Sequence, residues 1–155
     1  MQSAMNRGML STVLVLTGCI AIGAEQPRFE LRLVSEEPSS TTREYSLPGR
    51  KGIPTKVHVE TAVLLGSDAV QSARIERRED GGYGILVTFT ETGAELFGEI
   101  TSQNVNKQIA LFVGGQLYST PFVREPILGG TAHITGNFTA EQAARVAAIV
   151  SGSEQ

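Results

Sequence analysis

Two neighbouring glycines, Gly129 and Gly130, stand ahead of an alanine-rich run and raise the question of a phosphate site. Glycines bind phosphate when a helix begins directly after them, because the free N–H groups of its first turn then converge on the anion. Here seven residues separate Gly130 from Phe138, and no Gly-Lys-Ser or Gly-Lys-Thr sequence supplies a phosphate-binding lysine. We therefore expect the glycines to form a turn, and we expect no nucleotide cofactor.

Acid–base groups, nucleophiles and metal ligands are scarce in the sequence. His58 and His133 are its two histidines. His58 and Glu60 are spaced to share one face of a strand, but a zinc site needs three or four ligands, and solvated strand residues explain the pair. Ser102 and Ser119 lack the Gly-x-Ser-x-Gly surroundings of a hydrolase nucleophile. The sequence therefore predicts no catalytic, cofactor or metal site, and a small metal-dependent or hydrolytic enzyme is the least favoured interpretation.

Cys19, the single cysteine, is the residue for which the sequence indicates covalent chemistry. It follows an apolar stretch, residues 9–17, that has the length of a signal-peptide core and is too short to span a bilayer comfortably. Leu16-Thr17-Gly18 and Cys19 resemble the lipobox of bacterial lipoproteins, in which the small residues let the chain enter a peptidase and the thiol carries the lipid. The resemblance implies that residues 1–18 are a lipoprotein signal peptide and that Cys19 carries the lipid anchor, with palmitate.

Two questions about this end of the chain stay open. An ordinary signal peptidase that cuts near Gly23 or Ala24 would instead leave a soluble periplasmic protein without a cysteine. If Cys19 is lipidated, the residue after it is Ile20 and not an aspartate, which favours the outer membrane over retention at the inner one. In both cases the rest of the chain faces the periplasm.

Charge and hydropathy limit the partners of the mature chain. Of 13 basic and 16 acidic side chains, loss of Arg7 with the signal peptide leaves 12 and 16, a net charge near −4. This balance disfavours nucleic acid and anionic lipid headgroups as partners. No segment after the signal peptide is apolar enough to cross a membrane. We expect residues 19–28 to tether one soluble domain, residues 29–152.

Several short segments alternate apolar and polar residues, as half-buried strands do. They are residues 29–34, 56–65, 72–78, 83–89, 108–114, 116–123 and 133–135, with hairpin turns at residues 79–82 and at Gly114-Gly115. Residues 35–53 are polar and rich in turn-forming residues, so we expect a long exposed loop there.

Two further segments have the helical period of about 3.6 residues. The first covers residues 90–101, and the second begins after Thr139, which forms a capping box with Gln142, and ends at Gly152. Their apolar stripes are expected at Gly93, Leu96, Phe97 and Ile100 and at Ala143, Val146, Ala147 and Val150. The sequence therefore predicts an α+β fold, a single domain with a mainly antiparallel sheet and two amphipathic helices packed on one face.

An ordered series of short motifs fills residues 89–147. They are Phe-Thr, Gly93-Ala94, Phe97, Thr101, Asn104, Lys107, Ser119-x-Pro121, Pro126-Ile127, Gly129-Gly130, Ile134-x-Gly136 and Phe138-Thr139. In this order, over about sixty residues, they resemble the P1 head subdomain of SecD, the periplasmic part of the bacterial SecDF translocation auxiliary. The resemblance implies an extracytoplasmic α+β head that contacts substrate polypeptide or partner proteins such as Sec components.

We expect this chain to differ from SecD in its membrane part. SecD carries several membrane helices whose charged residues couple export to the proton gradient, and we expect no such helix here, so that activity is not carried over. We expect a stand-alone, lipid-anchored binding module that assists protein export or polypeptide handling in the cell envelope. A structural envelope lipoprotein without a role in export is the alternative.

Overall fold

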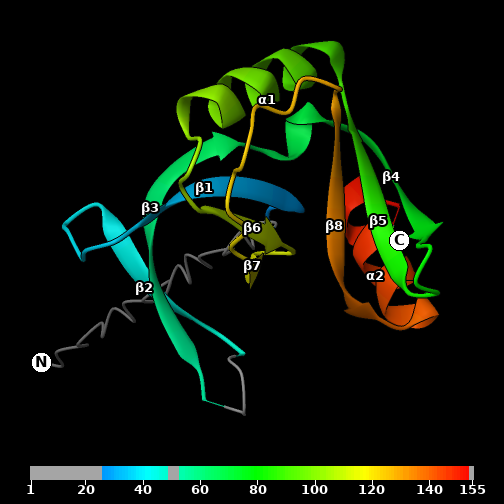
Figure 1. Ribbon diagram of the computed structural model, residues 1–155, viewed down its shortest axis with the longest axis horizontal. Coiled ribbons are helices and arrows are strands. Elements are labelled where there is room, and N and C mark those ends of the chain that lie inside the picture. Colours follow the sequence, from blue (N-terminus) through cyan, green and yellow to red (C-terminus); the bar gives the residue numbers. More distant parts are fainter. Residues whose placement is uncertain (1–25, 49–52, 154–155) are drawn as a thin grey trace, which may run out of the picture.

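The strands of the chain pair into two antiparallel sheets (Figure 1). The computed structural model describes residues 26–48 and 53–153. The larger sheet has the order β2-β3-β1-β6-β7 and is built from β1 (Phe29–Ser35), β2 (Thr42–Leu47), β3 (Thr55–Leu65), β6 (Ile109–Val113) and β7 (Gln116–Ser119). The smaller sheet has the order β4-β5-β8 and is built from β4 (Val70–Arg77), β5 (Tyr83–Phe89) and β8 (Thr131–Phe138).

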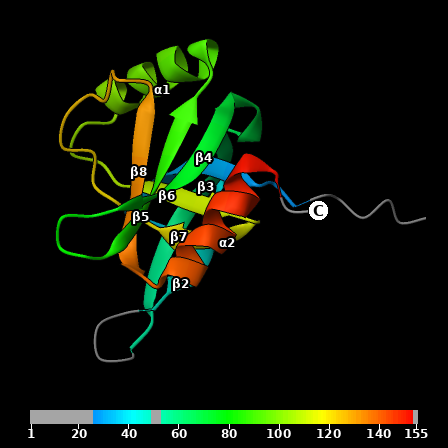
Figure 2. The same cartoon turned by 90° about the vertical axis from the view of Figure 1, so that its right-hand side faces the viewer.

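Two helices join the sheets (Figure 1 and Figure 2). Helix α1 (Glu91–Gln103) lies across one end of both sheets, and α2 (Ala140–Ser151) lies against β4 and β5 and also contacts β6. The α+β class, the antiparallel pairing and the two helices are confirmed. The strands are divided between two sheets because the short helix η2 (Ser67–Ala69) redirects the chain from β3 in the larger sheet to β4 in the smaller one.

One apolar core fills the space enclosed by the sheets and helices. The ring of Phe89 packs against two others in this core, with centroid distances of 5.9 Å to Phe29 and 4.7 Å to Phe97. All four residues of the predicted α2 stripe are buried in this core, and Gly93 and Phe97 of α1 are buried as well. Leu96 was wrongly expected in the α1 stripe: it is 43% exposed, and Thr101, one turn beyond Phe97, is buried instead.

The larger sheet is buried on both faces at β6, all of whose residues are buried. Its second face carries a small cluster around Val59, Ala110 and Phe112, against which the ring of Tyr45 packs at 5.0 Å in an edge-on contact. Tyr45 belongs to β2, one edge strand of the larger sheet, and β2 contacts β7, the opposite edge strand. The sheet is therefore curled over this cluster.

The loop predicted at residues 35–53 is wrong in its middle, because β2 lies there and pairs with β3 from Thr42↔Glu60 to Leu47↔Thr55. The strand carries four polar residues among its six and therefore lacks the alternation by which strands are recognised. Its pairing partner, not its own pattern, makes it a strand.

Two other local predictions agree with the structure, whereas the strand expected at residues 116–123 ends at Ser119. Gly114 and Gly115 have φ values of 56° and 75°, as a two-residue hairpin turn requires. The capping box of Thr139 and Gln142 is present in both directions. Gly115 N and Gly114 N donate to the carbonyls of Pro27 and Arg28, so the expected tether shares its last residues with the fold. The predicted signal peptide, residues 1–18, and the predicted lipid attachment at Cys19 lie outside the described residues and stay predictions.

Candidate functional site

Residues 120–130 cross from β7 in the larger sheet to β8 in the smaller one, and we name this segment the strap. Two backbone bonds hold its first half to the start of β6 and the residues just before it: Ile109 N donates to Pro121 O at 3.0 Å, and Val123 N donates to Lys107 O at 2.9 Å. Its second half is held to α1, because the Thr101 hydroxyl accepts a bond from Ile127 N at 2.9 Å. The strap therefore has a fixed path above the core.

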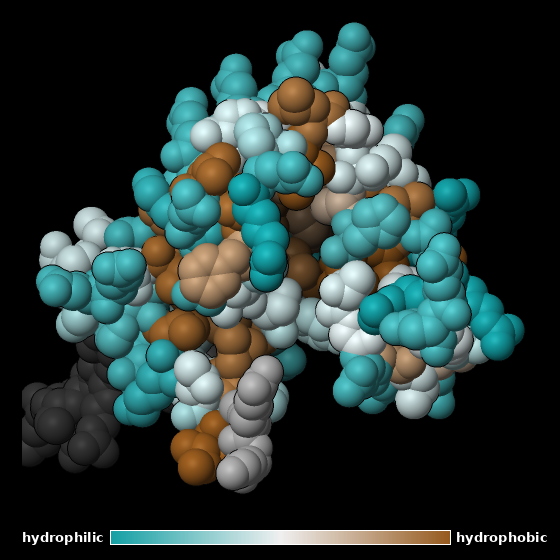
Figure 3. Space-filling view, viewed as in Figure 1, coloured by the Kyte–Doolittle hydropathy of each residue, from teal (hydrophilic) through white to brown (hydrophobic). Residues whose placement is uncertain are grey.

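Between the strap and β8 lies a groove of about 330 Å³, visible as a hollow with an apolar floor (Figure 3). Its volume is at the lower end of the range of about 300–1,000 Å³ for ligand sites. The floor carries no ionisable side chain and consists of Phe29, Leu31, Phe97, Thr101, Ile109 and Leu111. One wall is the strap, and the other is formed by Ala132, His133 and Ile134 of β8.

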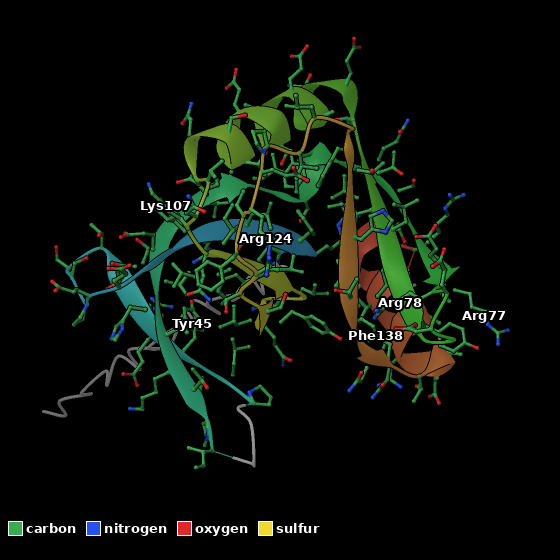
Figure 4. The ribbon with its side chains drawn as sticks, in the orientation of Figure 1. Tyr45, Arg77, Arg78, Lys107, Arg124 and Phe138 are labelled. Carbon is green, nitrogen blue, oxygen red and sulfur yellow. The ribbon has the colours of Figure 1, made fainter. Side chains whose placement is uncertain are left out.

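The strap wall presents apolar side chains to solvent. Phe122 is 62% exposed and Ile127 is 39% exposed, and both line the groove. Arg124 and Glu125 of the strap also line it, and Figure 4 shows Arg124 at the front of the space between the two sheets. The groove is therefore apolar on its floor and carries charges of both signs on one wall.

A second hollow, of about 350 Å³, follows β8 beyond the groove and is lined by residues 135–138 of that strand. Here Tyr118 of β7 reaches across to Phe138, and the two rings stack at 5.7 Å with an interplanar angle of 16°. Partial burial raises the pKa of Tyr118 above its ordinary value. The stack and the strap thus join the two sheets at opposite ends of β8.

The double glycine forms the turn from the strap into β8, as predicted. Gly130 has a φ of 69°, a left-handed conformation that glycine adopts without strain, and its carbonyl accepts a bond from Phe89 N. Strand β8 then occupies the chain up to Phe138, so α2 begins well beyond the glycines. At the start of this helix the Thr139 hydroxyl accepts a bond from Gln142 N.

The histidines and serines considered from the sequence are not brought together. His58 Nε2 lies 3.9 Å from Glu44 Oε2 on the larger sheet, whereas His133 Nδ1 lies 3.1 Å from Glu76 Oε2 on the smaller one. Ser102 Oγ donates to a carbonyl of its own helix, Gly98 O, at 2.7 Å. Within residues 26–48 and 53–153, no three His, Cys, Asp or Glu side chains are grouped as a metal site requires.

The groove was missed in the sequence because its parts come from distant segments. Its floor uses β1, α1 and β6, and its walls use the strap and β8. A partial signal was available: the strap places Phe122, Ile127 and Leu128 in a segment with two prolines and no helical or strand period. Exposed apolar residues in such a segment indicate a surface that meets another molecule.

Two antiparallel sheets joined by two helices define a domain of the α+β class. The sequence profile of the SecDF P1 head subdomain matches residues 42–153, and the chain belongs to this family.

Individual relatives agree with this assignment. Protein translocase subunit SecD of Syntrophobacter fumaroxidans is 37% identical over 103 residues, which cover 65% of this chain and 19% of that protein. SecD of Rickettsia bellii is 33% identical over 92 residues, covering 59% and 18%. The chain thus spans about a fifth of the length of the curated relatives it matches.

Solved structures of SecDF share the fold. A structure described as a membrane component SecDF that enhances protein export superposes with a TM-score of 0.63 at 26% identity, covering 81% of this chain and 63% of that one. Superposition on SecDF in its super-membrane-facing form gives the same TM-score, and the match covers 81% of this chain and 19% of the solved one. In the part of this chain that the structure describes, neither helix has the length and hydropathy needed to cross a bilayer.

Proposed function

We propose that this chain is an extracytoplasmic module of the SecD P1 head type that binds non-native polypeptide during protein export and is held at the membrane by lipid. Its membership of a family named after a protein translocase supports the link to export. The groove between the strap and β8 is the observation that carries the binding role.

The groove suits a polypeptide that has not folded. Folded proteins bury most of their large apolar side chains, whereas an unfolded chain offers them to an apolar surface. Phe122 and Ile127 are exposed on the groove wall, and burying such a side chain contributes about 1.5–3 kcal/mol. A client with accessible apolar residues therefore gains free energy here that a folded protein does not.

Binding of the client involves no catalytic step. The client is held by burial of apolar surface and by polar contacts at the rim.

Photo-crosslinking in cells tests the binding role. A photoreactive phenylalanine at position 122, on the groove wall, is expected to trap newly exported polypeptides. The matched control is position 53, since Ile53 is also apolar and is 71% exposed but does not line the groove. Equal trapping at both positions would contradict a specific site. Trapping of Sec components alone would indicate docking without client binding, and trapping of neither would favour a structural envelope lipoprotein.

The lipid anchor is proposed from the sequence around Cys19. Residues 1–18 would be removed, residues 19–28 would form the tether, and the lipid would hold residues 29–152 on the periplasmic side, with the outer membrane as the expected location. Labelling cells with a palmitate analogue tests this: the label is expected on the chain and absent from Cys19→Ser. A labelled Cys19→Ser variant, or an unlabelled chain recovered wholly in the soluble fraction, would overturn the anchor and leave the groove proposal untouched.

A further inference from the structure

The outer edge of β8 is open in a way that the other sheet edges are not. β8 pairs with β5 on one side and with no described strand on the other. Open edges are usually protected by charged residues, proline, shortness or a covering element. The other three edge strands have such protection. β2 carries the charged residues Arg43 and Glu44 and lies beside β7, β7 is short with four residues, and β4 is contacted by α2. Residues 131–135 of β8 contain no lysine, arginine or proline.

The register identifies the backbone groups that point outward from this edge. Phe89 N donates to Gly130 O at 3.0 Å, and Thr88 pairs with Thr131. In an antiparallel ladder, hydrogen-bonded pairs alternate with pairs whose N–H and C=O groups point away from the partner strand. The register runs unshifted to Gly84↔Thr135. The N–H and C=O groups of Thr131, His133 and Thr135 therefore face away from β5.

The space beside this edge is shaped for a chain and selects by charge. The groove lies along Ala132, His133 and Ile134, and the second hollow continues along residues 135–138, where β7 and α2 also line it, so open space follows the strand for most of its length. The groove floor has no ionisable side chain, whereas Arg124 and Glu125 lie on the strap wall. An extended chain that fits this space directs uncharged side chains to the floor of the groove and polar side chains away from it.

We propose that β8 receives an extended segment of the non-native client as an additional strand. This inference rests on the proposed function and states how the groove recognises its client. The segment bonds to the outward backbone groups of Thr131, His133 and Thr135 and places every second side chain over the floor. Since main-chain groups make these bonds, the site accepts many sequences and requires only uncharged residues at alternate positions.

Backbone methylation of a peptide tests the proposal on the unmodified protein. The probe is a fluorescein-labelled, end-capped octapeptide of alternating valine and threonine, and binding is measured by fluorescence anisotropy. The valines fix the register, because a slip of one residue would turn them away from the floor. Successive N–H groups of a strand point to opposite sides, so two derivatives are compared, one N-methylated at the valines and the other at the threonines.

One of the two methylated peptides is expected to bind at least about tenfold more weakly than the parent, and the other to bind nearly as well, because several hydrogen bonds are lost in only one of them. Equal affinity of both derivatives would overturn strand addition while leaving polypeptide binding intact. Carboxymethylated α-lactalbumin, which is unfolded, is tested separately as a second client. If neither the parent peptide nor this protein binds, the proposed function itself is overturned.

A variant of β8 gives a second, independent test. His133→Pro removes one outward N–H without removing a bond to β5, and proline is tolerated where a strand N–H faces solvent. His133→Ala is the matched control, since it also loses the contact with Glu76 but keeps the N–H. The proline variant is expected to bind the parent peptide several-fold more weakly than the alanine variant, with circular dichroism reporting that both are folded. Equal binding by two folded variants would overturn the proposal.

Discussion

The Thr101 hydroxyl connects α1 to the strap through Ile127. It donates to Phe97 O at 2.8 Å within its own helix and accepts a bond from Ile127 N at 2.9 Å. Thr101 is 1% exposed, so neither bond is exchanged with water. Thr101 therefore ties the wall of the groove to its floor, although Thr101 and Ile127 are 26 positions apart in the sequence.

Thr101→Val is expected to lower the free energy of unfolding by about 1–3 kcal/mol, because it leaves a partly buried N–H without an acceptor. Urea denaturation measures this change. Thr101→Ser is the control: it keeps the hydroxyl and loses one methyl group, which costs about 0.8 kcal/mol. A valine variant as stable as the unmodified protein would show that the bond to Ile127 N contributes nothing.

Phe122→Glu is expected to weaken binding of an unfolded client about tenfold, because it replaces an apolar contact on the groove wall with a charge. Ile53→Glu is the control, since Ile53 is equally apolar and more exposed but lies outside the groove. Affinity for carboxymethylated α-lactalbumin, measured by anisotropy, separates the two. A similar loss in both variants would indicate nonspecific hydrophobic binding.

Phe138→Ala is expected to return the pKa of Tyr118 towards about 10, because burial raises it and the Phe138 ring covers one face of the phenol. NMR titration of carbon-labelled tyrosine follows this group directly. Phe122→Ala is the control and should leave the titration unchanged. A pKa of Tyr118 that does not respond to Phe138→Ala would mean that other neighbours desolvate it.

The raised pKa of Tyr118 also predicts how the stability of the protein depends on pH. A phenol with a raised pKa in the folded protein stays neutral there while the unfolded chain already ionises, so the stabilisation is complete below about pH 10 and declines as the pH rises towards the folded value. Tyr118→Phe should remove this part of the decline. An unchanged profile in denaturation experiments above pH 10 would exclude a contribution of Tyr118.

Thr139→Ala is expected to lower the free energy of unfolding by about 1 kcal/mol, since it removes the acceptor for Gln142 N at the start of α2. Thr139→Ser retains a hydroxyl and should cost clearly less. Thermal denaturation compares the two variants. If serine and alanine are equally destabilising, the methyl group of Thr139 and not its capping bond is the important feature.

Local sequence was sufficient for the features that depend on neighbouring residues. The hairpin at Gly114-Gly115, the capping box of Thr139 and the buried stripe of α2 follow from turn chemistry and from a period of 3.6 residues, and all three are present. The order of motifs between residues 89 and 147 was also sufficient to indicate the family, to which the chain belongs.

The tertiary structure alone decided the features that depend on distant residues. β2 is a strand because β3 pairs with it, although its own residues are mostly polar. The groove exists because Thr101 and the strap meet above β1 and β6, and the open edge of β8 exists because the strands divide into two sheets. A sequence pattern reports which face of an element is apolar, but it does not report which other element covers that face or leaves it open, because that depends on how the whole chain packs.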